Sequence, residues 1–192
     1  LVAGDFRSAA TRAEHLQHAA EMAQDRTFGM IAKRARGSVA FHLGQHAQAN
    51  DLLDQALASY DRDTHGPLAK THGYDHAEIT AVFLGFSRWS IGDPVAARDY
   101  LDFAVSHSRD IEHAHSLVQA LAFRALLGAV LRDPNLCASG TEAKRYGQRH
   151  GLPSLALAGG YFASAGGVIC AGQTVAKDQL SRFIDFTLGH QG

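Results

Sequence analysis

Apolar residues recur along much of the chain at the three- and four-residue spacing of an amphipathic α-helix. Ile79, Val82, Phe83 and Phe86 show this spacing clearly, and it appears again near the C-terminal end in 174–188. Short polar segments with Gly, Pro or Asp separate the periodic stretches. The pattern predicts nine helices, at 5–24, 28–43, 46–59, 75–90, 94–108, 113–131, 134–149, 153–171 and 174–188.

An internal repeat accompanies this pattern. A glycine followed by alanines five and twelve positions later occurs twice, at Gly44 and at Gly92. The same spacing can be continued to positions 4, 132 and 172, and we call all five the frame positions of the repeat. Glycine at the end of a first helix accepts a left-handed C-cap, and small alanines let a second helix pack closely on the first. The residues predicted to pack the repeat are Gly44, Ala49, Ala56, Gly92, Ala97 and Ala104.

Acidic residues mark the expected helix starts. Asp93 and Asp133 each precede a proline, and a proline at the first helical position after an acidic N-cap is favourable. Asp75 stands three residues before Glu78, which is the spacing of a capping box. These local signals support the predicted helix boundaries.

Together these features predict an all-α, tetratricopeptide-like superhelical solenoid of antiparallel helix hairpins. We expect one domain over residues 1–192. The unpaired first helix and the missing initiator methionine indicate that the chain is a fragment of a larger protein. The expected units are a lone helix at 5–24 and hairpins at about 28–59, 75–108, 113–149 and 153–188.

Composition agrees with helices: the chain has 33 Ala and 20 Leu, but only 15 Val and Ile together. A net charge of −1 argues against binding nucleic acid through bulk charge. We find no apolar run near the roughly 20 residues needed to span a bilayer. Two cysteines, Cys137 and Cys170, are too few for a disulfide framework, so we expect a cytoplasmic protein and inert thiols.

A narrower resemblance appears between residues 40 and 190. Its motifs include Tyr60-Asp61, His65 and His72-Gly73-Tyr74-Asp75, followed by 86–94, 112–117, 149–153 and 160–163. This order resembles the tetratricopeptide-like C-terminal region of bacterial predicted ATPases, many of which are fused to class III adenylate/guanylate cyclase domains and others to DNA-binding regulators. The sequence departs from that pattern at His115, where proline is common, and at Arg88, where leucine is usual. The resemblance implies a regulatory region whose catalytic domains lie upstream.

Candidate binding residues follow from the solenoid geometry. First helices of successive hairpins line a concave face that binds extended peptides or helices. Arginines on these helices are expected to clamp a carboxylate or an acidic segment, and two of them lie eight residues before a frame position. The candidate arginines are Arg34, Arg36, Arg88 and Arg124.

Histidines near the 60–74 segment allow two interpretations. His65, His72 and His76 are possible zinc ligands, which makes a metal-dependent enzyme one alternative. Because a helix starting at Asp75 separates His72 from His76, we instead predict that the segment is a tethered polar loop without metal. The predicted tethering residues are Tyr60, Asp61, His65, Gly73 and Asp75.

The Gly-rich stretch 159–167 lacks the Lys-Ser/Thr of a phosphate-binding loop, so we predict neither catalytic residues nor a cofactor in this chain. The leading hypothesis is a non-catalytic interaction and regulatory module of a bacterial signalling ATPase or cyclase. A free-standing tetratricopeptide adaptor is the alternative. The expected partners are a protein, a peptide or upstream domains of the same chain, with no nucleic acid or membrane, and self-association through the solenoid ends is possible.

Overall fold

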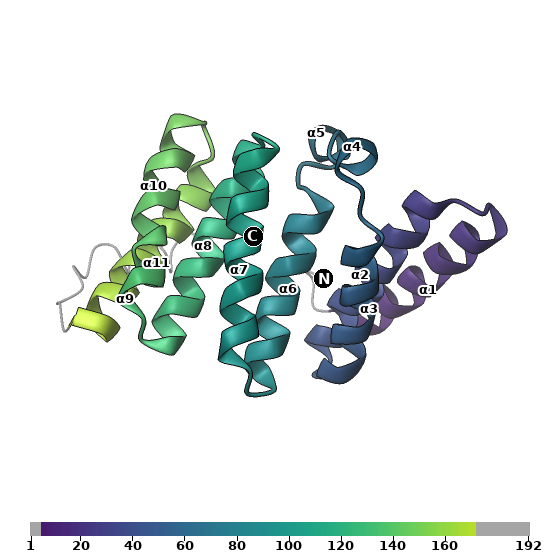
Figure 1. Cartoon of the computed structure of the whole chain (residues 1–192), viewed down its shortest axis with the longest axis horizontal. Helices are drawn as coiled ribbons and strands as arrows, with labels where there is room; N and C mark the ends of the chain where they lie inside the picture. The colour runs from purple at the N-terminus through teal and green to yellow at the C-terminus, as the bar shows by residue number, and fades with distance from the viewer. Residues whose placement is uncertain (1–4, 172–192) are drawn as a thin grey trace. The chain divides into compact units, whose positions relative to one another are not determined.

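The computed structural model describes residues 5–171, with side chains to residue 169. Throughout this part the chain is helical and contains no β-strand, which confirms the predicted all-α class (Figure 1). The helix predicted at 174–188 and the frame positions 4 and 172 lie outside the described residues. Contacts divide the chain into two compact units, 1–111 and 112–192, each of which is described by itself.

Unit 1 consists of helices that pack against their neighbours in the chain. Helix α1 packs on α2, α2 on α3 and α6 on α7, while α3 also packs on α6. The α2 helix begins two residues before its predicted start, because the Asp25 carboxylate accepts a hydrogen bond from the Phe28 amide at 3.0 Å and so caps the helix. The helices are α1 (Phe6–Met22), α2 (Arg26–His42), α3 (His46–Ala58), α4 (Arg62–His65), α5 (Leu68–His72), α6 (His76–Ser90) and α7 (Pro94–Asp110).

The polar loop predicted at 60–74 contains two short helices. Asp61 caps α4 by accepting a hydrogen bond from the Thr64 amide at 2.8 Å. Gly73 ends α5 in a left-handed conformation with φ +79°. In Figure 1 the two short helices lie together at one end of α6.

The helix-to-helix turns share one backbone geometry. Gly44 and Gly92, the two clear frame glycines, have φ +74° and +87°. Arg132, the next frame position after Gly92, takes the same left-handed conformation at φ +55° although it is not glycine. After each of them the next amide donates a hydrogen bond back to the carbonyl five residues earlier, as in a Schellman turn. These bonds are Gln45–Ala40 at 2.9 Å, Asp93–Arg88 at 2.9 Å and Asp133–Gly128 at 2.8 Å.

Two glycines of unit 1 face leucine side chains. A Cβ atom on Gly37 would lie 2.6 Å from Leu53 Cγ, and a Cβ atom on Gly85 would overlap Leu101. Both leucines have 0% of their surface exposed. Each leucine therefore fills the space that its glycine leaves open, and the two pairs are separated by the same 48 residues as Gly44 and Gly92. The core around Leu53 also contains Ala40, Ala49 and Leu84, with Phe41, Leu57, Phe83 and Tyr100 packed against it.

Within its described residues, unit 2 is organised around α8, which packs against α9, α10 and α11. From the sequence we expect no apolar run of membrane-spanning length, but by length and composition alone the 18-residue α8 is apolar enough to cross a membrane, and 56% of that stretch is buried within the chain. Helices α10 and α11 also pack along each other. The helices are α8 (Ala114–Leu131), α9 (Pro134–Cys137), α10 (Ser139–Arg149) and α11 (Pro153–Ala171).

The single helix predicted at 134–149 is interrupted after Cys137. At the interruption the Thr141 amide bonds to the Ala138 carbonyl, three residues back instead of four, at 3.2 Å. The tighter turn changes which residues face inward. As a result Ala143 is fully buried, whereas Lys144, the twelfth residue after Arg132, is exposed.

Two glycines of unit 2 face main chain. A Cβ atom on Gly140 would lie 2.7 Å from both the Ala163 nitrogen and the Gly159 oxygen. A Cβ atom on Gly128 would lie 2.6 Å from the Cys137 nitrogen. Backbones therefore approach closely between α10 and α11 and between α8 and α9.

Candidate functional site

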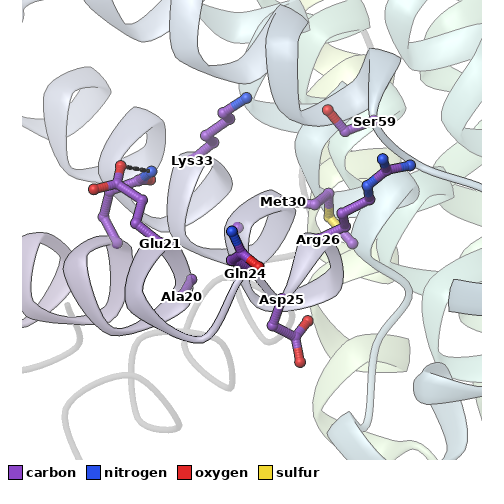
Figure 2. A pocket seen from close by; sticks show the side chains of 10 residues that line it. Ala20, Glu21, Gln24, Asp25, Arg26, Met30, Lys33 and Ser59 are labelled. Atoms are coloured by element: carbon purple, nitrogen blue, oxygen red, sulfur yellow. Dashed lines mark hydrogen bonds between the residues drawn. The ribbon is translucent and has the colours of Figure 1, made fainter.

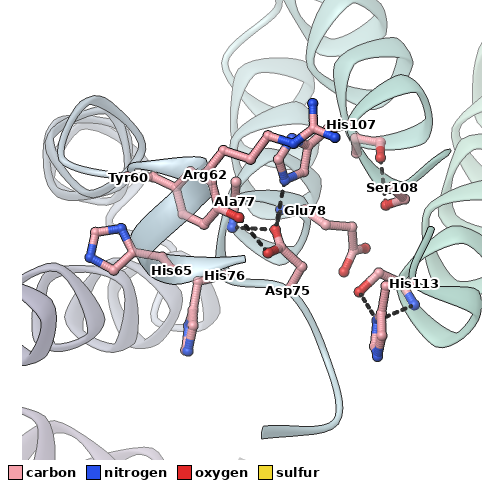
Figure 3. A network of polar contacts seen from close by, with 12 residues as sticks. Tyr60, Arg62, His65, Asp75, His76, Ala77, Glu78, His107, Ser108 and His113 are labelled. Atoms are coloured by element: carbon pink, nitrogen blue, oxygen red, sulfur yellow. Dashed lines mark hydrogen bonds and ion pairs between the residues drawn. The ribbon is translucent and has the colours of Figure 1, made fainter. Parts of the chain in front are cut away.

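A buried polar network in unit 1 is centred on Asp75 (Figure 3). Its side chain is fully buried, and Oδ1 accepts hydrogen bonds from the amides of Ala77 at 2.9 Å and Glu78 at 3.0 Å, which cap α6. Oδ2 accepts a 2.7 Å hydrogen bond from the Tyr60 hydroxyl. His107 of α7 places Nε2 3.0 Å from Oδ1. One carboxylate thus joins the start of α6, the end of α7 and the segment after α3.

Hydrogen bonds set the protonation states of Asp75 and Tyr60 in this network. Burial alone would raise the pKa of Asp75, but hydrogen bonds from His107 and Tyr60 lower it overall. Burial raises the pKa of Tyr60, and its hydrogen bond to the Asp75 carboxylate raises it further. The network therefore contains an ionised carboxylate and a protonated phenol at neutral pH.

The three histidines predicted as tethering or metal-binding residues fall into two groups. His65 contacts other residues, whereas His72 and His76 contact each other. His65 accepts a hydrogen bond at Nδ1 from the Asp61 amide at 2.8 Å, and its Nε2 lies 3.3 Å from the Thr27 hydroxyl on α2. His72 Nδ1 lies 2.7 Å from His76 Nε2, because the turn at Gly73 brings the end of α5 back onto the start of α6.

The His76 ring is only 1% exposed. Burial lowers its pKa to about 4, and the positive charge of Arg34 acts in the same direction. His76 is therefore neutral at pH 7. Within residues 5–169 no three His, Cys, Asp or Glu side chains form a group that would hold a metal ion, so the structure does not assemble the three-histidine alternative there.

Two of the four candidate arginines, Arg88 and Arg124, connect helices within their own unit. Arg88 Nη2 lies 2.6 Å from Asp54 Oδ2, while the Tyr100 hydroxyl donates to the other oxygen of Asp54 at 2.7 Å. Arg124 Nη1 donates to the Ser139 hydroxyl at 2.6 Å, which ties α8 to α10. Both guanidinium groups therefore hold helices together.

The other two candidate arginines are both on α2 and line different hollows. Arg36 is partly buried and, like Glu14, is one of the residues that line a small hollow of about 80 Å³ between α1, α2 and α3. Arg34 donates a 3.2 Å hydrogen bond from Nη2 to the Tyr74 hydroxyl, and its guanidinium carbon lies 5.4 Å from the centre of the Tyr74 ring. Burial lowers the pKa of Arg34.

A cavity of about 490 Å³ lies between α1, α2 and the end of α3 (Figure 2). In that view Glu21 and Lys33 lie on one side, and Arg26 and Ser59 lie on the other. Met30, only 2% exposed, is also part of its lining. The lining mixes both signs of charge, which gives the cavity no clear preference for an anion or a cation.

A second cavity, of about 470 Å³, lies between α1 and α2 along a different set of residues. We call it the α1–α2 pocket. Arg12 and Arg34 are its cations and Asp5 is its acid. The rest of the lining is Ser8, Ala9, Ala13, Leu16, Ala35, Ser38 and Val39.

Sequence reasoning named Tyr60 and Asp75 but missed His107, Tyr74 and Arg12. Tyr74 was part of a recognised motif, although nothing marked it as the contact of Arg34. His107 carries no local signal, since its partner Asp75 lies 32 positions earlier.

No protein-family model, curated protein or solved structure matches this chain. The tetratricopeptide-like resemblance therefore remains a prediction from the motifs quoted above.

Proposed function

We propose that this chain is a helical-repeat interaction and regulatory module of a multidomain bacterial signalling ATPase or nucleotide cyclase. The observation that carries the proposal is the repeated packing in unit 1. Leu53 fills the space over Gly37 just as Leu101 fills the space over Gly85, 48 residues further on. Repetition of one helix-pair design is the basis of tetratricopeptide-like solenoids.

The contacts of the polar residues fit the same proposal. Asp75, Tyr60 and His107 bind one another, and Arg88 binds Asp54. Such contacts stabilise a scaffold, and they leave the outer faces of the helices to bind a partner. A scaffold of this kind transmits a binding event to attached domains without chemistry of its own.

The attachment to an ATPase or cyclase rests on the resemblance of the motifs around residues 60–94. In this proposal the module is cytoplasmic and binds a protein, a peptide or upstream domains of the same polypeptide. Nucleic acid and membrane lipid are not its partners. A free-standing adaptor is the second form of the proposal, and it differs only in the absence of attached domains.

The size of the native polypeptide tests the proposal first. Serum raised against residues 1–192 would be used for an immunoblot of the source cells. A band several times larger than the 20.6 kDa of this chain supports a regulatory segment within a longer protein. A band at 20.6 kDa contradicts that form and supports the free adaptor.

Arg36 offers a test of the binding face, since nothing shows it holding helices together. We expect Arg36→Glu to weaken binding of the attached or partner domain about tenfold, because it reverses one charge on α2. Calorimetry with the separately purified partner domain measures this. Arg124→Glu is unsuitable, because it removes the bond between α8 and Ser139. Unchanged affinity for Arg36→Glu would exclude this part of α2 from the interface.

A further inference from the structure

The guanidinium of Arg34 is a partly buried cation without an acidic partner in the part of the chain that the structure describes. Its polar contact is the Tyr74 hydroxyl, and Nε is buried without a hydrogen-bond acceptor. The Tyr74 ring supplies a cation–π contact but no negative charge. Removing a charge from water without a counterion costs free energy, so this position gains stability from an oxyanion.

Arg34 lines the α1–α2 pocket, and a second cation joins it there. Arg12 comes from α1, is exposed and forms no ion pair with the described residues. Asp5 also lines the pocket, but one of its oxygens accepts the Ser8 amide at 3.0 Å and caps α1. Two cations and one acid therefore line the pocket, and their formal charges sum to a net positive charge.

The uncharged lining of the α1–α2 pocket limits the kind of ligand. Alanine, leucine and valine side chains form most of it. The Ser38 hydroxyl donates to the Arg34 carbonyl at 3.0 Å, so its proton is not available to a ligand. The volume of about 470 Å³ lies within the ordinary range of small-molecule sites. A ligand that fits combines an oxyanion with a short aliphatic portion.

We propose that the α1–α2 pocket binds a carboxylate carried on a short aliphatic chain, with Arg12 and Arg34 as its hydrogen-bond donors. Two parallel N–H groups of a guanidinium match the two oxygens of a carboxylate, and the aliphatic chain contacts Ala13, Leu16 and Val39. A free dicarboxylic acid and a glutamate side chain of a peptide share this chemistry. The inference does not depend on the attachment to an ATPase or cyclase.

The test is an NMR titration of the ¹⁵N-labelled chain with glutarate, with the capped peptide acetyl-Glu-Glu-Glu-amide, and with inorganic phosphate. We expect glutarate or the peptide to shift amides in 9–16 of α1 and 34–39 of α2. Raising the salt from about 0.05 M to about 0.5 M should weaken binding severalfold, because the pocket is open to solvent. Stronger binding of glutarate identifies a free acid as the source, and stronger binding of the peptide identifies a protein.

Three variants distinguish binding in the α1–α2 pocket from nonspecific attraction of an anion to the charged surface. Arg34→Gln should weaken binding tenfold or more, and Arg12→Gln about threefold to tenfold, since each removes a charge-assisted donor. Arg7→Gln is the matched control: Arg7 is exposed on the same helix as Arg12 but does not line the α1–α2 pocket. We expect it to change affinity less than about twofold.

Arg34→Gln also removes the contact with Tyr74, so circular dichroism must show that the variant keeps its helices. Arg12→Gln changes an exposed side chain and tests the proposal even if Arg34→Gln unfolds. The proposal is overturned if neither carboxylate shifts these amides at about 10 mM, which corresponds to binding too weak for a built site. Equal losses in Arg7→Gln and Arg12→Gln overturn it as well, as does binding of phosphate alone.

Discussion

The two units use glycine in different ways. In unit 1, Gly37 makes room for the side chain of Leu53, whose Cγ would lie 2.6 Å from an added Cβ atom. In unit 2, Gly140 faces the main-chain atoms of Gly159 and Ala163, which cannot adjust without moving a helix. Glycine therefore admits a side chain at position 37 and a backbone at position 140. Tolerance to added volume should differ accordingly.

The two units also differ in how many hydrogen bonds depend on one polar side chain. Asp75 in unit 1 accepts hydrogen bonds from two amides, a phenol and an imidazole while fully buried. In unit 2, Arg124 makes a partly buried bond to Ser139. Unit 1 should thus be the part whose stability depends on charge and pH.

The largest expected effect is that of Asp75→Ala. The change leaves the Tyr60 hydroxyl, the His107 imidazole and two amides at the start of α6 without their acceptor. We expect a loss of about 4 kcal/mol in the free energy of unfolding, measured by urea denaturation. Asp93→Ala is the control, because Asp93 caps α7 through the Ala96 amide, and it should cost about 1 kcal/mol. Equal losses of stability in the two variants would mean that the hydrogen bonds from Tyr60 and His107 to Asp75 add nothing to the capping of α6.

The next effect compares the two kinds of glycine directly. We expect Gly140→Ala to cost about 3 kcal/mol, since the new methyl group meets backbone on α11. Gly37→Ala should cost less, about 1–2 kcal/mol, because the new methyl group meets side-chain atoms instead of main chain and alanine favours the helix. Thermal unfolding measures both, at roughly 2–4 °C per kcal/mol for a chain of this size. The comparison between the units is wrong if Gly37→Ala proves the more damaging.

A smaller effect concerns pH. His76 has a pKa of about 4 in the folded chain and about 6.5 when unfolded, so the unfolded state takes up a proton first as the pH falls. Stability should decline as the pH decreases from about 6.5 to about 4, with a loss of about 2 kcal/mol by pH 5.

Urea denaturation at pH 7 and pH 5 measures this loss, and His76→Gln should remove most of the pH dependence. The titration of Asp75 does not affect the comparison between pH 7 and pH 5. Its pKa is lowered, so its contribution is lost only at pH values below the ordinary range of an aspartate. An unchanged slope in His76→Gln would place the pH response elsewhere in the chain.

The smallest effect is a gain. Gly29 is a helical glycine in α2 with open space where a Cβ atom would lie. Gly29→Ala should therefore raise the free energy of unfolding by about 0.5–1 kcal/mol, because alanine restricts the unfolded chain and adds no clash. Thermal unfolding beside Gly140→Ala measures it. A loss of stability would show that the surroundings of Gly29 are tighter than the structure indicates.

Local features of the fold were predictable because a few neighbouring residues determine them. Asp93 caps α7 and Asp133 caps α9, as the acid–proline pairs predict. Gly44 and Gly92 take the left-handed conformation expected at the ends of first helices. Arg132 shows that this turn also forms without glycine. The spacing of the repeat therefore predicted a turn at position 132, although the residue type there did not.

Features that join distant segments were not predictable from the sequence. Asp54, which binds Arg88, lies 34 positions before it and resembles any exposed acid in the pattern. His72 was expected in a loop and apart from His76, because a helix was predicted to start at Asp75, yet the turn at Gly73 brings the two rings together. Periodicity gives the buried face of a helix but not the neighbour that a charged side chain meets.

The close packing of α11 on α9 has a practical consequence for measuring local motion. A Cβ atom on Gly166 would lie 2.6 Å from the Cys137 sulfur, and Cys137 is 6% exposed. An alkylating reagent therefore reaches this thiol only when the two helices separate. With Cys170 replaced by serine, the rate of iodoacetamide labelling at Cys137 would report how often unit 2 opens, and Gly166→Ala should accelerate it.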